Sequence, residues 1–317
     1  MLVGRGSFKQ LPLRRPVAAD FRVVILDLLV ERSEFGHGGN QEILAPIAEF
    51  GSVEVLLLTP QMQSPESGER AQKEGIVKIS ESDVPNWDYD FPFWDELTME
   101  ISGNSVLFRR IAMPLHGDDL LTSRWLDALG PDAVICSGSR RNVSMWEEWM
   151  AGGASVLRCA SNMGIPTIGI CFGHQLLCKA LGASVERAES LSNGVWDLNL
   201  TEKGDSDEIF SSRRSGAGNS PAVLFTHQDH VMSVPDCCSL LGSTIHNGVT
   251  AVRVLDERGE PLPAWGVQFH PEAAKARVER AFEWGHITED ELEAFRREHD
   301  GAGILGSFAA VVIRNQS

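Results

Sequence analysis

A cysteine framed by two glycines stands between an apolar run and a helix-forming run, and this segment constrains the fold more than any other. It reads Gly-Ile-Cys-Phe-Gly-His-Gln over residues 169–175. The apolar run 165–170 predicts a buried strand, and 174–181 predicts a helix that ends at Gly182. Cys171 is therefore expected on a sharp strand-to-helix turn, with its thiol exposed near the positive helix N-terminus that favours a thiolate.

A second segment, Gly-Val-Gln-Phe-His-Pro-Glu at residues 266–272, supplies a base and an acid for this nucleophile. A thiol is only partly ionised near neutral pH, so acyl transfer needs a base and a group that orients the base. Residues two apart on an extended chain point to the same face, so the carboxylate of Glu272 can hold the imidazole of His270. The predicted catalytic triad is Cys171, His270 and Glu272.

The stretches PTIGICFGHQLL and WGVQFHPE resemble the nucleophile and His-Glu signatures of class I glutamine amidotransferases. By this resemblance the chain is identified as a member of that family, in the GMP-synthase-like branch that includes γ-glutamyl peptidases. The stretch Cys-Ser-Gly-Ser from Cys136 is a third match, similar to the oxyanion loop of the family. It implies that backbone N–H groups of Gly138, Ser139 and Phe172 stabilise the tetrahedral oxyanion.

Two further matches imply the substrate pocket. FTHQDHVMSVP at residues 225–235 is similar to the His-x-Asp-x-Val segment of the GMP-synthase-like branch, and NGVWDLN at 193–199 is a weaker match to a Gly-Trp-Asp/Glu segment. The resemblance covers about residues 130–275. It implies that the glutamyl group is held by Gln175, Trp196, His227, Gln228 and Asp229.

The order of the elements predicts an α/β fold, a three-layer sandwich with a mostly parallel central sheet. We expect strands at 21–29, 53–59 and 132–137, and helices near 40–50, at 118–129 and at 144–163. Short alternating runs between residues 184 and 269 predict antiparallel strands that complete the sheet and bring His270 to the nucleophile. Because ligands of open α/β sheets bind at the carboxyl ends of the strands, Ser137 and Cys171 are expected to lie together.

Outside this pattern the chain is expected to carry additions. The predicted organisation is a leader at residues 1–20, an amidotransferase-like domain at 21–275 and a C-terminal helical extension at 276–317. Segments 274–284 and 288–298 predict two helices, which either cap the sheet or support a homodimer. The aromatic and acidic segment 84–97 fits a lid, a partner-binding patch or an insertion packed on the surface, and the last is preferred.

Composition excludes several classes of protein. With 317 residues, 43% of them hydrophobic, the chain can bury a large core. A net charge of −16 argues against nucleic-acid binding. The longest apolar stretches, 23–30 and 53–58, are far shorter than the ~20 residues that span a bilayer, so no membrane segment is expected. The six cysteines show no CxxC pair and no secretory signal is recognised, so we expect a cytoplasmic protein.

Metal ions and organic cofactors are not expected. His227, Asp229 and His230 resemble a ligand set, but nothing else in the sequence supplies the remaining ligands or an open position. The predicted activity is hydrolysis of glutamine or another γ-glutamyl amide through a thioester on Cys171.

The leaving group stays open at this point. If it is ammonia, the chain is a glutaminase subunit that feeds a separate synthase, since no G-x-x-x-x-G-K-[ST] motif indicates a nucleotide-binding synthase domain. If it is a larger amine, the enzyme works alone as a γ-glutamyl peptidase or amide hydrolase, and the SGS and HQD segments favour this reading slightly. A non-catalytic protein that binds glutamyl ligands or a partner is disfavoured, because nucleophile, base and orienting acid are all present.

Overall fold

The computed structural model describes residues 19–27, 33–59, 96–114, 117–139, 141–212, 215–283, 285 and 287–316. The leader expected at residues 1–20 lies outside the described residues except for its last two positions. The aromatic and acidic segment 84–97 also lies outside them, except that residues 96 and 97 begin a strand.

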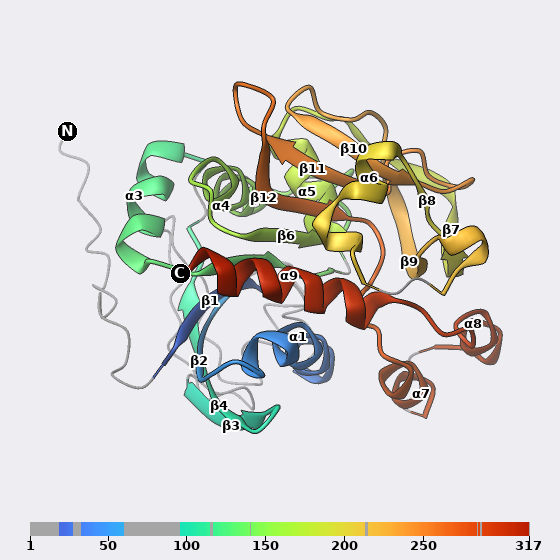
Figure 1. Ribbon diagram of the computed structural model, residues 1–317, viewed down its shortest axis with the longest axis horizontal. Coiled ribbons are helices and arrows are strands. Elements are labelled where there is room, and N and C mark those ends of the chain that lie inside the picture. The colour runs from blue at the N-terminus through green and yellow to red at the C-terminus, as the bar shows by residue number, and fades with distance from the viewer. Residues whose placement is uncertain are drawn as a thin grey trace.

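A ten-stranded sheet forms the centre of the described chain (Figure 1). Its strands are β1 (Phe21–Leu26), β2 (Val53–Thr59), β3 (Glu96–Ile101), β4 (Asn104–Ala112), β5 (Ala133–Cys136), β6 (Thr167–Ile170), β8 (Asn199–Leu200), β10 (Cys238–Ser243), β11 (Ala251–Leu255) and β12 (Pro261–Val267). Their order is β3-β4-β2-β1-β5-β6-β12-β11-β10-β8, and every neighbouring pair from β4 to β12 is parallel. The predicted mostly parallel sheet is confirmed.

Helices cover both faces of this sheet. On one face lie α1 (Ser33–Ala48) and α9 (Gly301–Asn315), and on the other lie α3 (Asp119–Leu129), α4 (Met150–Asn162) and α5 (Phe172–Ala180) (Figure 1). In β1, Ile25 belongs to the core that contains Phe308 of α9, whereas Leu26 belongs to the core that contains Leu157 and Leu176 of α4 and α5. Because both faces are covered, the inner strands are continuous apolar runs, and the predicted three-layer sandwich is confirmed.

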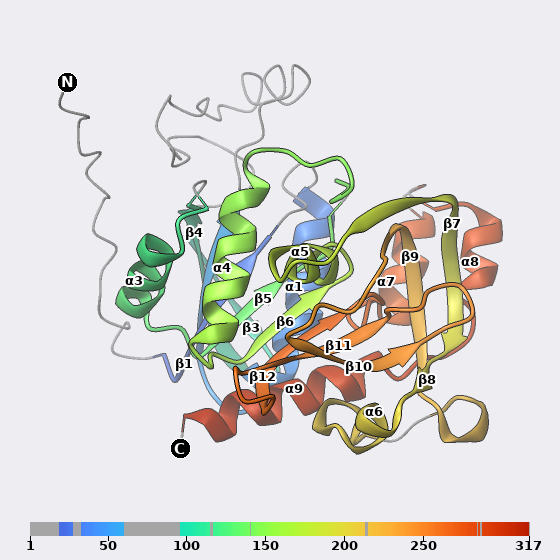
Figure 2. The same cartoon turned by 90° about the horizontal axis from the view of Figure 1, so that it is seen from above.

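Strands β7 (Val185–Asp197) and β9 (Ala222–Val231) form a separate two-stranded antiparallel sheet. The prediction that the strands after Gly182 all complete the main sheet is therefore wrong for this pair, although β8, β10 and β11 do extend it. The physical reason is a satellite core: Val195 and Leu224 pack with Phe295, which follows α8 (Glu289–Ala294), instead of joining the main core. Figure 2 shows α7 (Lys275–Glu283) and α8 beside β7 and β9, far from α3.

The C-terminal segment contains one helix more than the sequence patterns indicate. The capping box of Thr288 and Glu291 is present, but α8 ends at Ala294, before the predicted end at 298. Helix α9 then follows and packs under the sheet, where the ring of Phe308 meets Trp265 of β12 edge-on at a centroid distance of 6.2 Å. This part of the extension is therefore an integral layer of the sandwich.

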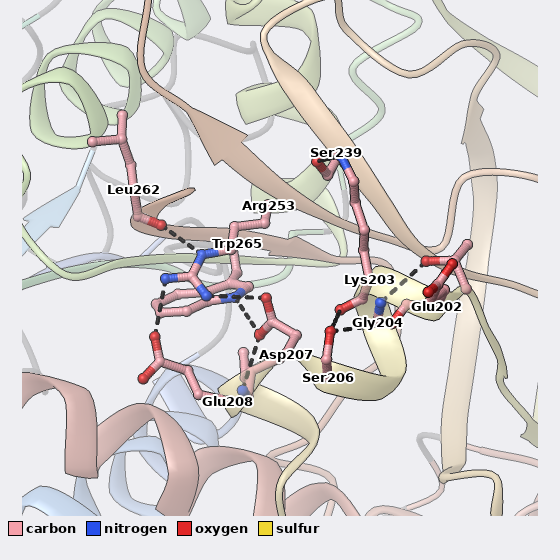
Figure 3. Close-up of polar contacts among 12 residues, drawn as sticks. Glu202, Lys203, Gly204, Ser206, Asp207, Glu208, Ser239, Arg253, Leu262 and Trp265 are labelled. Atoms are coloured by element: carbon pink, nitrogen blue, oxygen red, sulfur yellow. Dashed lines mark hydrogen bonds and ion pairs between the residues drawn. The ribbon is translucent and has the colours of Figure 1, made fainter. Parts of the chain in front are cut away.

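A polar cluster links β12 to residues 207 and 208, which lie between β8 and β9 in the chain (Figure 3). The guanidinium of Arg253 in β11 lies 4.5 Å from the ring centre of Trp265 and donates to Asp207 and Glu208 at 3.0 and 2.9 Å. The indole N–H of Trp265 donates to Asp207 at 3.0 Å. Charge-assisted hydrogen bonds around the buried Asp207 favour one geometry, so the cluster helps to position β12, the strand that leads to His270.

No helix in the described ranges combines the length and the apolar character that crossing a membrane requires.

Candidate active site

Cys171 occupies the predicted turn between β6 and α5. Its backbone has φ 51° and ψ −101°, a conformation that non-glycine residues rarely adopt. The backbone N–H of Cys171 donates to Val267 of β12 at 2.8 Å, and its carbonyl accepts from Gln175 at 3.1 Å. The expected exposed thiol is more enclosed than predicted, since the residue is only 6% exposed and its Sγ lies 4.0 Å from the carbonyl oxygen of Thr226 in β9.

The two glycines around Cys171 are required by backbone contacts. A Cβ on Gly169 would lie 2.5 Å from the carbonyl oxygen of Gly173, and a Cβ on Gly173 would lie 2.4 Å from that of Cys136. Both distances are far shorter than a van der Waals contact, and the nearest atoms belong to the backbone, which cannot move away as a flexible side chain can. The G-x-C-x-G pattern thus reflects the close approach of α5 to the ends of β5 and β6.

His270 and Glu272 follow β12 and face each other as predicted. Nδ1 of His270 lies 2.8 Å from Oε1 of Glu272, and the backbone N–H of His270 donates to Leu224 of β9 at 2.8 Å. With Nδ1–H donating to the carboxylate, the other nitrogen, Nε2, carries the lone pair that accepts a proton. Nε2 is buried and has no hydrogen-bond partner among the described residues.

Gly138 shows that the three segments converge. It follows β5, and a Cβ built on it would lie 2.9 Å from Cε1 of His270 and 3.9 Å from Cβ of Cys171. The carboxyl ends of β5, β6 and β12 therefore meet at one point, where the parallel strands are neighbours in the sheet. The structure brings the residues of the predicted triad into one site.

The charges of the site favour a protonated imidazole. Burial alone would lower the pKa of His270, but the acidic groups of Cys171 and Glu272 outweigh it and raise the pKa to about 10. A protonated imidazole at this position can act as a general acid toward a leaving group.

We expect Glu272→Gln to lower kcat/KM about 10²- to 10⁴-fold and to move the alkaline limb of the pH profile to lower pH. The raised pKa keeps His270 protonated until the pH approaches about 10, and loss of the carboxylate charge lowers that pKa. The raised pKa also contributes to folding stability. This contribution from the His270 imidazolium is complete below the pKa of the unfolded state, about 6.5, and is lost as the pH rises through about 10. Initial rates between pH 5 and 11 measure the shift, and an unmoved alkaline limb contradicts the assignment.

The residues expected to form the oxyanion hole lie around the cysteine. Phe172 is the first residue of α5, where backbone N–H groups have no partner within the helix. Its ring stacks on Trp149 at a centroid distance of 6.0 Å and an interplanar angle of 15°. Gly138 and Ser139 lie in the loop after β5, where Ser139 Oγ accepts from the backbone N–H of Arg141 at 3.1 Å. The placement fits the predicted role, which stays a prediction.

Two predicted pocket residues, Gln175 and Asp229, are joined directly. Nε2 of Gln175 donates to the carbonyl of Asp229 at 2.9 Å and to Oε1 of Gln268 at 3.1 Å. Gln268 is fully buried and was not singled out from the sequence, although it stands in the WGVQFHPE segment two residues before His270. Its place two residues before His270 on one extended segment could have identified Gln268 as a residue of the site.

The carboxylate of Asp229 holds the loop that follows the oxyanion residues. It accepts from the backbone N–H of Ser144 at 2.7 Å and from the Ser144 hydroxyl at 2.9 Å. The predicted helix 144–163 is wrong at its start, because this long-range acceptor keeps residues 141–149 in a loop and α4 begins only at Met150. Asp229 therefore anchors the loop that follows Gly138 and Ser139.

His227 is buried next to this pocket. Neither of its ring nitrogens has a hydrogen-bond partner among the described residues. Burial, then the charges of His230, His270 and His174, lower the pKa of His227 to about 3, so the ring is neutral. A neutral imidazole with two free nitrogens fits contact with a polar ligand, in line with the predicted substrate role.

The remaining predicted pocket residues are held in other ways. Gln228 donates to the carbonyl of Ala188 at 3.0 Å and accepts from Arg187 at 2.7 Å. Trp196 packs between Phe225 and His246, at centroid distances of 5.2 and 4.5 Å. These contacts make Trp196 part of the aromatic packing behind β9, and they do not place it against Cys171.

No group of His, Cys, Asp and Glu side chains in the described ranges is arranged to hold a metal ion.

Comparisons with known proteins identify the family of the chain. The family model "Glutamine amidotransferase class-I" matches residues 111–282. A glutamine-hydrolysing GMP synthase subunit from Methanothermobacter thermautotrophicus is 34% identical over 141 residues, which is 42% of this chain and 69% of that protein. A GMP synthase of Staphylococcus epidermidis is 30% identical over 174 residues, or 53% of this chain, and the match spans only 30% of that longer protein.

Solved structures show the same fold at lower identity. A putative GMP synthase subunit from Thermoplasma acidophilum superposes with a TM-score of 0.51 at 15% identity, covering 95% of this chain and 98% of that one. The glutaminase domain of Trypanosoma brucei CTPS gives 0.50 at 12% identity, covering 93% and 94%. Since the family model covers more than half of the residues, the chain belongs to the class I glutamine amidotransferase family.

Proposed function

We propose that this protein hydrolyses the γ-amide bond of glutamine or of another γ-glutamyl compound through a thioester on Cys171. The observation that carries the proposal is the convergence of three strand ends, which sets the enclosed cysteine beside an imidazole held 2.8 Å from a buried carboxylate. A nucleophile on a strand-to-helix turn, a base beside it and an acid that orients the base are the parts that acyl transfer needs.

The first half of the reaction forms the thioester. The thiolate of Cys171 attacks the γ-carbonyl carbon, and the oxygen takes the negative charge, stabilised by backbone N–H groups near Gly138 and of Phe172. As the tetrahedral intermediate collapses, the imidazolium of His270 gives its proton to the leaving nitrogen. The amine departs, and the γ-glutamyl group remains bound to the sulfur.

The second half releases glutamate. The neutral imidazole of His270 takes a proton from a water molecule, which attacks the thioester carbonyl, and the C–S bond breaks. Glu272 stabilises the imidazolium in both halves, so one base serves two proton transfers. Neither half requires a metal ion or an organic cofactor.

A second candidate is a glutaminase subunit that passes ammonia to a separate synthase. The relative from Methanothermobacter thermautotrophicus favours it, because that protein is named as one subunit of a glutamine-hydrolysing GMP synthase. The two candidates share the chemistry at Cys171 and differ in the leaving group and in the need for a partner.

We expect the purified chain to release glutamate from glutamine or from at least one member of a panel of γ-glutamyl amines and γ-glutamyl amino acids. Glutamate and the released amine are quantified together, with and without a synthase subunit. Cleavage of a substituted amide by the chain alone supports the hydrolase, whereas activity on glutamine only in the presence of the synthase supports the glutaminase subunit. The absence of turnover in every case contradicts both.

A further inference from the structure

His270 and Glu272 lie on a tight turn that follows β12. The backbone N–H of Ala273 donates to the carbonyl of His270 at 3.2 Å, which closes a four-residue β-turn. Pro271 and Glu272 are its two central residues, and proline suits the first of these positions because its ring fixes φ. The carboxylate of Glu272 is 2.8 Å from Nδ1 of His270, and this distance depends on how firmly the turn is held.

The end of this turn is bound by a residue far along the chain, His299. Nε2 of His299 lies 2.8 Å from the carbonyl oxygen of Ala273, and Nδ1 accepts from the backbone N–H of Gly301 at 3.1 Å. Because Nδ1 is an acceptor, the ring proton is on Nε2 and is donated to Ala273. Both ring nitrogens have partners, so the imidazole is fixed in its orientation and in its tautomer.

The first residue of α9, Gly301, also contacts the turn. A Cβ built on Gly301 would lie 2.3 Å from the carbonyl oxygen of Pro271 and 2.7 Å from its Cα. Backbone atoms this close leave no room for a larger residue unless the turn moves. The start of α9 therefore packs directly on the corner between His270 and Glu272.

Asp300 connects this segment to β9, the strand that also holds the base. Its backbone N–H donates to the carbonyl of Ala222, and its carboxylate accepts from the backbone N–H of Ala222, both at 2.8 Å. Two residues further along β9, the carbonyl of Leu224 accepts from the backbone N–H of His270 at 2.8 Å. Strand β9, the turn and residues 299–301 thus form a closed ring of hydrogen bonds.

Apolar packing supports the same connection. Phe295, four residues before His299, is buried in one core with Leu224 of β9, and Ala273 packs against that core. The C-terminal segment therefore contacts both the strand that binds the backbone of His270 and the residue that follows Glu272.

We propose that His299 is a positioning residue of the active site: by holding the carbonyl of Ala273, it keeps the carboxylate of Glu272 on Nδ1 of His270. The inference rests on the proposed function and adds a residue beyond position 282, where the match to the family model ends. His299 acts through the turn and does not touch the reacting atoms. In this arrangement the segment before α9 belongs to the catalytic machinery.

The first test replaces His299 by phenylalanine, which keeps a ring and removes both hydrogen-bonding nitrogens. A catalytic group displaced by about 1 Å can cost about 100-fold in rate, so we expect kcat to fall about 10- to 100-fold, with KM changed less than about twofold. His299→Gln is expected to restore most of the rate, because its amide supplies a donor for Ala273 and an acceptor for Gly301. An unchanged kcat in His299→Phe overturns the inference.

A double-mutant cycle distinguishes positioning from a general loss of stability. In the Glu272→Ala background no carboxylate remains to be positioned, so His299→Phe is expected to lower kcat further by less than about twofold. Fully additive losses overturn the inference. Arg297→Gln is the control in the same segment, since Arg297 pairs with Asp197 at the surface and is expected to leave kcat unchanged. An equal loss in Arg297→Gln also contradicts the role of His299.

Histidine NMR supplies a measurement that does not depend on turnover. The titration of the His270 imidazole is expected to move to lower pH in His299→Phe, because a more distant carboxylate stabilises the imidazolium less. An unmoved titration overturns the inference, and His299→Ala, which adds no bulk, is measured in the same way if His299→Phe does not fold. Failure of the proposed function is a different outcome, because wild type itself would then cleave none of the γ-amides, whereas the titration still reports on the turn.

Discussion

Replacement of Cys171 by alanine is expected to reduce kcat for γ-glutamyl hydrolysis by at least about 10⁴-fold while the protein still folds. The sulfur is the atom that forms the bond to substrate, and no other side chain described in the site supplies a nucleophile at that position. Alanine keeps the backbone of the turn and removes a single small buried atom. The measurement combines turnover of the best panel substrate with thermal denaturation.

Cys237→Ala is the matched control for this change. Cys237 is a half-buried free cysteine just before β10, so its replacement removes the same atom outside the site and is expected to leave kcat unchanged. A Cys171→Ala protein that folds normally and keeps wild-type turnover contradicts the proposed mechanism. A Cys171→Ala protein that fails to fold is recognised by its lost thermal transition.

The second large effect is expected for Gly173→Ala, which should lower the free energy of unfolding by about 3 kcal/mol or more. Its new Cβ would lie 2.4 Å from the carbonyl oxygen of Cys136, so α5 must move away from β5. That movement also displaces Phe172, whose backbone N–H is predicted to bind the oxyanion, and we expect kcat to fall in any protein that remains folded. Urea denaturation and turnover measure the two effects.

Gly248→Ala tests whether the effect is specific to the close approach. Gly248 is exposed, and a Cβ built on it meets no atom within 4 Å. Its replacement is expected to change stability by less than about 0.5 kcal/mol. Equal destabilisation by both substitutions would show that the close approach to Cys136 is not the reason why position 173 requires glycine.

Much of the fold could be predicted because its signals are local. The strands around Cys171 are buried on both faces and read as apolar runs, and the turn between β6 and α5 is encoded by the glycines at 169 and 173. The capping box of Thr288 and Glu291 was predicted in the same way and is present. In each case neighbouring residues determine the backbone, so a short window of sequence contains the information.

The misplaced start of α4 shows why other features were out of reach. Residues 144–149 have a helical pattern, but Ser144 donates both its N–H and its hydroxyl to Asp229, which is 85 positions away in the chain. Helix α9 has an apolar face, but its sequence does not show that this face packs against the central sheet. The start of α4 and the packing of α9 both depend on residues far away in the chain, so local sequence patterns do not predict them.

The sequence by itself indicated the chemistry that we propose for this protein, through a cysteine on a glycine-framed turn and a histidine with a carboxylate two residues away. Only the tertiary structure decided that β5, β6 and β12 end at one point and that β9 passes beside the sulfur. The physical reason is that reactivity follows from the side chains and their immediate neighbours. Distances between segments a hundred residues apart follow instead from the packing of the two cores against the sheet.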